Sequence, residues 1–200
     1  IRILRYTKTG AYDATIEMQI GPGNGGNNPY FSISAAPEGA SSVVHLARID
    51  GNGALVYNRR TGVNNWYGEM TLDNSGAAFA TPYGNPSVVF AKAAPADPGS
   101  YNKVYIIYLS TYGSVNYAVG PATATLAAEF TITRDWQNKT GGASAPQAPA
   151  FVQLPYPVPV AWTGGGSVNF DMIPTSNNAA PAVTSVSPGT VGIGAGIEDS

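Results

Sequence analysis

The chain has 200 residues, of which 44% are hydrophobic and only 11% are charged, and it contains no cysteine. The absence of cysteine excludes disulfides, thiolate metal sites and cysteine nucleophiles. A net charge of −2, with ten scattered basic residues, predicts no strong nucleic-acid binding by this chain. No apolar run reaches the roughly 18 residues of a membrane span. So low a share of charged residues predicts surfaces that neighbouring molecules cover.

The sequence predicts short β-strands along most of its length, because apolar and polar side chains alternate with a period of two. The alternation is clearest in Asp13–Ile20 and Thr123–Thr133, as in antiparallel strands with one wet face. Val104–Leu109 is apolar on both faces, which predicts a central strand. The other predicted strands are, in chain order, Ile1–Thr7, Tyr30–Ala35, Val43–Ile49, Ala54–Asn58, Trp66–Leu72, Ser87–Ala91 and Ser114–Val119.

Tight turns separate these strands. Asp50–Gly53 lies between two predicted strands and has the residues of a hairpin turn with left-handed backbone positions, and Asp73–Gly76 repeats this chemistry. No window of the sequence keeps a clean helical period, so a helix content below about 15% is predicted, against an ordinary third.

The composition changes after Lys139, because residues 140–200 hold eight of the sixteen prolines and none of the basic residues. Residues 140–150 are predicted to be a linker, and residues 151–200 a Pro/Gly/Ala-rich extended segment. Prolines remove backbone donors, so Phe151–Trp162 is predicted to run along a surface or a sheet edge without a ladder of its own. Its uncharged apolar side chains predict a subunit contact anchored by Tyr156 and Trp162.

No catalytic or cofactor-binding residue is predicted. His45 is the only histidine, and it lies inside an apolar strand with no second ligand nearby, which indicates a structural role. A glycosidase needs two carboxylates that converge across a cleft. The chain has only twelve acidic residues, mostly in predicted turns or on polar faces, so it is not predicted to be an enzyme. The carboxylates in predicted strands are Asp13, Glu17, Glu69 and Glu129.

Two glycine-containing segments resemble ligand-binding loops only in part. Gly21–Gly26 matches a dinucleotide fingerprint in its letters, but a strand follows it where the mechanism needs a helix. Asp50–Gly53 echoes the start of a calcium loop whose later ligands are absent, which favours a hairpin turn and predicts no metal site within the chain. A calcium ion shared between subunits through Asp50, Asp73 or Asp97 stays open.

Aromatic residues are concentrated in the predicted strands. They are predicted to be core or interface anchors, and the alternative is a platform on which sugar rings stack. These residues are Trp66, Tyr67, Tyr83, Tyr105, Tyr108, Tyr112, Tyr117 and Trp136.

Two segments resemble the closing strands of icosahedral-virus coat proteins of the jelly-roll class. Lys103–Ser114 is similar to their penultimate strand, and Ala124–Trp136 to the last strand, which alternates and ends at a charged pair. The resemblance implies an antiparallel jelly-roll β-sandwich over residues 1–139, followed by a linker and an outer segment. The arginine-rich arm of many small RNA-virus coat proteins is absent from the sequence. The predicted core residues are Ile16, Met18, Ile20, Phe31, Val44, Leu46, Ile106, Leu126, Phe130 and Ile132.

The leading functional prediction is a structural subunit of a virus capsid or a similar shell, located in the virion. Such a subunit binds copies of itself, and other coat proteins, through weakly charged surfaces. The alternatives are an extracellular carbohydrate-binding β-sandwich or the receptor-binding head of a phage fibre, with a glycan or a host receptor as partner.

Overall fold

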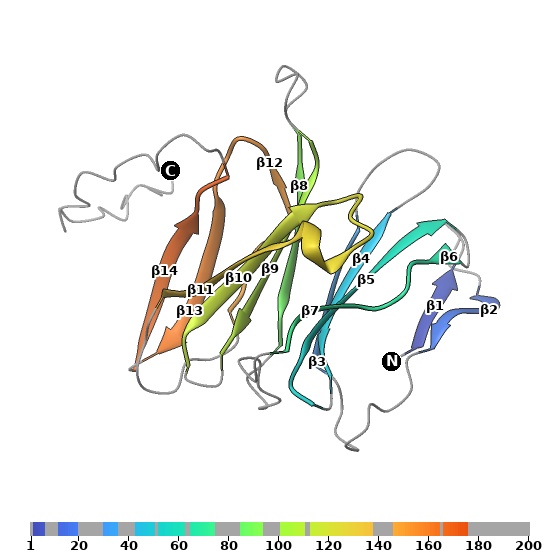
Figure 1. Cartoon of the computed structure of the whole chain (residues 1–200), viewed down its shortest axis with the longest axis horizontal. Coiled ribbons are helices and arrows are strands. Elements are labelled where there is room, and N and C mark those ends of the chain that lie inside the picture. Colours follow the sequence, from blue (N-terminus) through green and yellow to red (C-terminus); the bar gives the residue numbers. More distant parts are fainter. Residues whose placement is uncertain are drawn as a thin grey trace, which may run out of the picture.

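The computed structural model shows an all-β protein (Figure 1). Among the described residues the only helical segment is η1 (Ala127–Glu129), a single 3-10 turn, so the predicted all-β fold is confirmed. The structure describes residues 2–6, 12–19, 30–35, 43–50, 52–62, 65–74, 85–93, 101–110, 113–137, 146–164 and 166–175.

Two five-stranded sheets form the body of the fold. The first sheet contains β3 (Tyr30–Ala35), β4 (Val44–Ile49), β5 (Leu55–Gly62), β6 (Asn65–Trp66) and β7 (Met70–Asp73). The second contains β8 (Ser87–Lys92), β9 (Lys103–Leu109), β10 (Val115–Pro121), β11 (Thr131–Gln137) and β12 (Phe151–Gln153). Two antiparallel hairpins form sheets of their own, from β1 (Arg2–Tyr6) with β2 (Tyr12–Gln19) and from β13 (Val158–Gly164) with β14 (Ser167–Ile173).

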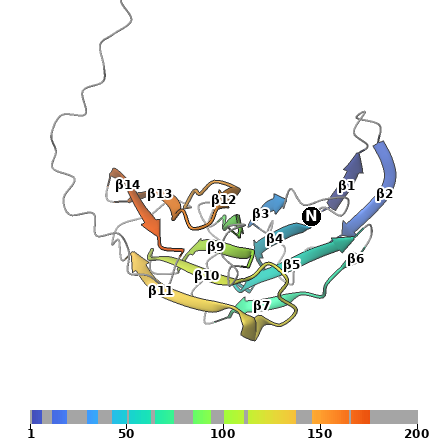
Figure 2. The same cartoon turned by 90° about the horizontal axis from the view of Figure 1, so that it is seen from above.

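The second sheet lies in the middle of the molecule, because it buries side chains on both faces (Figure 2). In β8, Val88 and Phe90 pack against β4, β5 and β7 in a first core, whereas Val89 and Ala91 pack against β13 and β14 in a second. The described strands therefore form three β layers. Val104–Leu109 lies in β9, in the middle of the second sheet, so the prediction of a central strand is confirmed. The second core contains Val89, Ala91, Tyr105, Ile107, Leu109, Val115, Val152, Leu154, Val158, Val160, Trp162 and Ile173.

The order of the strands is that of two meanders joined face to face. β3, β4 and β5 pair consecutively in the first sheet, and β8 to β11 pair consecutively in the second. A jelly roll instead places strands from distant parts of the sequence beside one another. The described strands therefore form an antiparallel β-sandwich without the predicted jelly-roll order. The exception to antiparallel pairing is β12, which pairs with β8 in parallel.

The prediction of one strand over Thr123–Thr133 was wrong. The chain instead forms a turn and η1, and the strand begins only at Thr131. The Glu129 carboxylate accepts hydrogen bonds from the backbone N–H groups of Thr125 (2.6 Å) and Leu126 (2.8 Å), which closes a local turn in place of a ladder. Leu126 is consequently 64% exposed and is not a core residue.

The predicted core was correct for the central strands and wrong at an edge. Leu46, Ile106 and Phe130 are buried, and Val44 and Ile132 are half-buried. Phe31 is exposed, because β3 turns its serines inward: Ser34 Oγ donates to the Ala150 carbonyl, and Ser32 Oγ accepts from the Val88 N–H. The predicted core positions Ile16, Met18 and Ile20 have side chains outside the described part of the structure.

The proline-rich segment forms more structure than was predicted. β12 lies at a sheet edge, as expected, but β13 forms a full ladder with β14, so the prediction of no ladder was wrong. Ala161 exchanges both backbone hydrogen bonds with Gln147, on the edge of β13 away from β14. Since alternate residues point their N–H groups the same way, the missing N–H of Pro159 faces that outer edge as well. The ladder with β14 therefore loses no bond there.

The hairpin turn predicted at Asp50–Gly53 is confirmed. The Asp50 carboxylate accepts hydrogen bonds from the N–H groups of Asn52 and Ala54, both at 2.9 Å, and Ile49 faces Leu55 across the strands. Gly53 has a φ of 79°, in the left-handed region that residues with a Cβ avoid. The related turn at Asp73–Gly76 ends at residues outside the described part of the structure.

Gly53→Ala is expected to lower the free energy of unfolding by about 1–2 kcal/mol, because the added Cβ strains the left-handed backbone. Urea denaturation measures the loss. The matched control is Gly62→Ala, since Gly62 has no positive φ and an added Cβ there meets its nearest described atom at 3.9 Å. Equal losses in the two variants would contradict the strain at Gly53.

Candidate functional site

His45 is a core residue. Its ring stacks between Tyr57 and Phe90, with centroids at 6.1 Å and 5.6 Å, and its Nδ1 lies 2.7 Å from the Tyr57 hydroxyl. Burial, and secondly the positive charge of Arg59, lower the pKa of His45 to about 4. Its Nε2 contacts no hydrogen-bonding group among the described residues. This environment is that of a packed neutral imidazole, as the sequence predicted.

The described carboxylates have separate structural roles. Asp73 is buried and accepts hydrogen bonds from Tyr108 and Arg134, while Glu69 pairs with Arg48 at 2.5 Å. Hydrogen bonds from the Thr125 and Leu126 amides lower the pKa of Glu129. Within the described ranges, no three His, Asp or Glu side chains gather to hold a metal ion. Asp97 and the side chains of Asp13 and Glu17 lie outside those ranges.

The two residues predicted as subunit anchors lie in different environments. Trp162 is only 3% exposed, within the second core, where its ring lies 6.0 Å from that of Trp136. It therefore belongs to the chain's own core and not to a surface that a neighbour can reach. Tyr156 is 69% exposed in the turn before β13, where Thr175 Oγ1 donates to its carbonyl at 3.1 Å.

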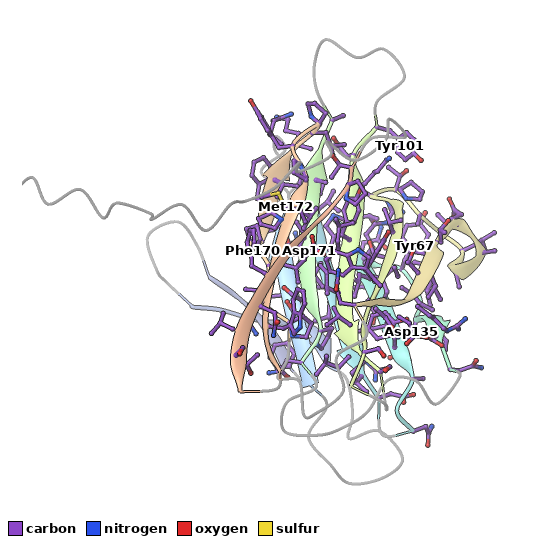
Figure 3. The ribbon with its side chains drawn as sticks, turned by 90° about the vertical axis from the view of Figure 1, so that its left-hand side faces the viewer. Tyr67, Tyr101, Asp135, Phe170, Asp171 and Met172 are labelled. Atoms are coloured by element: carbon purple, nitrogen blue, oxygen red, sulfur yellow. The ribbon has the colours of Figure 1, made fainter. Side chains whose placement is uncertain are left out.

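An apolar surface that sequence reasoning missed lies on the outer face of β13 and β14. Val168, Phe170 and Met172 are 79%, 60% and 46% exposed, and their partners across the hairpin are Thr163, Ala161 and Pro159. These six residues, here named the hairpin face, include no charge. Figure 3 shows Phe170 and Met172 on β14. Asp171 lies on the other face and contacts Gln137.

Apolar and polar residues alternate along β14 in the sequence, but this alternation predicts that the apolar residues face inward, the opposite of what the structure shows. A strand whose apolar residues alternate with Asn169 and Asp171 is normally placed with its apolar side inward. In the structure, β13 buries Val158, Val160 and Trp162 against the second sheet. The apolar residues of β14 lie on the other face of the hairpin and remain in solvent.

A second surface feature is a groove beside β5 and β6. It has a volume of about 430 Å³ and is lined by Arg59, Thr61, Asn65, Trp66, Tyr67 and Gly68. Tyr67 is exposed and Trp66 half-buried, whereas Tyr105 and Tyr108 are core residues. Tyr117 and Trp136 are partly buried against the second core, in edge-to-face contact at 5.8 Å. Tyr83 and Tyr112 lie outside the described residues.

Arg59 is the residue of this groove that sequence reasoning missed, although a signal was present. Arg59 and Arg60 are consecutive in a strand, so their side chains point to opposite faces and one of them is directed inward.

No protein-family model, curated protein or solved structure matches the chain. Among the described residues, no helix has the length and apolar character that crossing a lipid bilayer requires.

Proposed function

We propose that the chain is a structural subunit that assembles with copies of itself into a shell of the virus-capsid type. The observation that carries the proposal is the hairpin face, an uncharged row of exposed apolar side chains on a regular two-stranded surface. Contiguous apolar surface of this kind marks sites of protein association. The proposal includes no catalytic role and locates the chain in the virion.

A second copy of the chain is the partner that this surface fits best. β14 is an edge strand of its two-stranded sheet, so its outer backbone groups can pair with those of another β14 across a two-fold axis. Such pairing would bring two hairpin faces into one continuous apolar sheet. The low share of charged residues, 11% of the chain, also favours subunits surrounded by neighbours of the same kind.

Tyr156 provides a further contact in this proposal. It is exposed at the start of the β13–β14 hairpin, and the Thr175 side chain holds its turn through the carbonyls of Pro155 (2.7 Å) and Tyr156 (3.1 Å). A large aromatic side chain on a fixed turn loses little conformational freedom when a partner covers it.

Phe170→Asp is expected to weaken assembly at least thirtyfold in protein concentration, because one buried hot-spot contact contributes about 2 kcal/mol. Mass photometry across a concentration series measures the particles. Leu126→Asp is the matched control, since Leu126 is similarly exposed but lies near η1, on the side of the molecule away from β14 (Figure 2). It should assemble as the wild type does.

Three results would contradict the proposal. A wild-type chain that stays monomeric at all concentrations would exclude a shell, and a stable trimer would favour a fibre head. Particles that form equally well from the Phe170→Asp chain would exclude the hairpin face as the contact.

A further inference from the structure

Arg59 is a buried cation without an anionic partner among the described residues. Arg59 is only 6% exposed. To the other described residues its side chain donates one hydrogen bond, a long one of 3.4 Å from Nη1 to the Ala122 carbonyl. Its Nε has no hydrogen-bond partner in the part of the chain that the structure describes. A buried guanidinium normally pairs with a carboxylate or a phosphate, because desolvation without compensation is unfavourable.

The nearby carboxylates are engaged elsewhere. Glu69 pairs with Arg48, and Glu129 accepts hydrogen bonds from two backbone amides. The charge of Arg59 contributes to lowering the pKa of Glu129, after the hydrogen bonds from the backbone. Among the described residues, most of the hydrogen-bonding capacity of Arg59 is therefore unused.

The groove places Arg59 beside an aromatic wall and neutral polar groups. Its guanidinium carbon lies 4.6 Å from the centre of the Tyr67 ring, and the Tyr67 N–H donates to the Arg59 carbonyl at 2.8 Å, which fixes the two residues together. Trp66 forms part of the same wall, with Thr61 and Asn65 beside it. Figure 3 shows Tyr67 on the surface, away from Phe170 and Met172.

We propose that this groove binds an acidic glycan through a carboxylate-bearing sugar ring, a function beyond that of a shell subunit. The planar guanidinium of Arg59 matches a carboxylate in a bidentate geometry. Tyr67 and Trp66 offer aromatic surface to the apolar side of the ring, and Thr61 and Asn65 offer hydrogen bonds to its hydroxyls. The volume of about 430 Å³ lies within the range of small-ligand sites.

Calorimetric titration of the full chain at constant ionic strength tests the proposal with four probes, namely glucuronate, glucose, acetate and inorganic phosphate. Glucuronate is expected to bind at least about tenfold more tightly than each of the others, because it alone offers both the carboxylate and the ring. Acetate or phosphate binding as tightly as glucuronate would overturn the sugar assignment. Equal binding of glucose would overturn the role of the cation, and no binding of glucuronate would overturn the site.

Variants of the wall assign the binding to this groove. Arg59→Gln is expected to reduce glucuronate affinity at least about tenfold, whereas Arg60→Gln, on the opposite face of β5, changes it less than about twofold. If Arg59→Gln does not fold, Tyr67→Ala tests the proposal instead, since the Tyr67 side chain is exposed and its backbone bond to the Arg59 carbonyl does not depend on that side chain. Unchanged glucuronate affinity in a folded Arg59→Gln or Tyr67→Ala chain would overturn the proposal.

Discussion

Acidification from pH 7 to pH 4 is expected to lower the free energy of unfolding by about 3 kcal/mol through His45 alone. Burial, with a smaller effect of the Arg59 charge, lowers the pKa of His45 from 6.5 to about 4 in the folded chain. Folding therefore favours the neutral ring, so this stability is present above pH 6.5 and is lost as the pH falls toward 4. Each pKa unit corresponds to about 1.4 kcal/mol.

Urea denaturation at several pH values between 7 and 4 measures this loss. His45 is the only histidine of the chain, so no other side chain with an ordinary pKa titrates between pH 6.5 and pH 5. The control is His45→Phe, which keeps an aromatic ring between Tyr57 and Phe90 and removes the titrating group. Its stability should be nearly constant over that range. A parallel decline in both proteins would assign the pH dependence to other groups.

Sequence reasoning located most strands because alternation and turn chemistry are local properties. Tyr30–Ala35 was predicted with its observed bounds, and Val43–Ile49 and Val104–Leu109 to within one residue. The apolar nature of Val104–Leu109 on both faces even indicated a layer on each side of it. The Asp50–Gly53 turn followed from an Asp and a Gly at positions that bond and bend the backbone.

The parts that the sequence did not reveal depend on contacts between distant residues. Nothing local indicates that Val158, Val160 and Trp162 cover the far face of the second sheet, so the third layer was taken for an extended tail. At Leu126 and Glu129, a side-chain hydrogen bond competes with the strand that alternation predicts. The hairpin face and Arg59 could be recognised only once the layers fixed which side of each strand is inward.

The second large effect is expected at Asp73, at the end of β7. Its buried carboxylate accepts a hydrogen bond from the Tyr108 hydroxyl at 2.7 Å and one from Arg134 Nη2 at 3.1 Å. Asp73→Ala removes both carboxylate oxygens. The hydroxyl of Tyr108, a residue of the first core, then lacks the acceptor to which it donates. Because the buried bond from Tyr108 contributes about 1.5–3 kcal/mol, and a buried hydroxyl left without its acceptor costs about 1–3 kcal/mol more, the loss in free energy of unfolding is expected to be about 3–5 kcal/mol.

A double-mutant cycle separates the buried bond from the exposed one. Tyr108→Phe should cost about 1.5–3 kcal/mol, because it removes only the hydroxyl, and Arg134→Gln less than about 1 kcal/mol, because Arg134 is exposed and solvent screens its charge. In the Asp73→Ala/Tyr108→Phe chain, the hydroxyl that Asp73→Ala leaves without an acceptor is also removed. The double variant should therefore be more stable than the sum of the single losses predicts, by about 1–3 kcal/mol. Strict additivity, or a loss below about 1 kcal/mol in Asp73→Ala, would show that Asp73 does not hold β7 against β9.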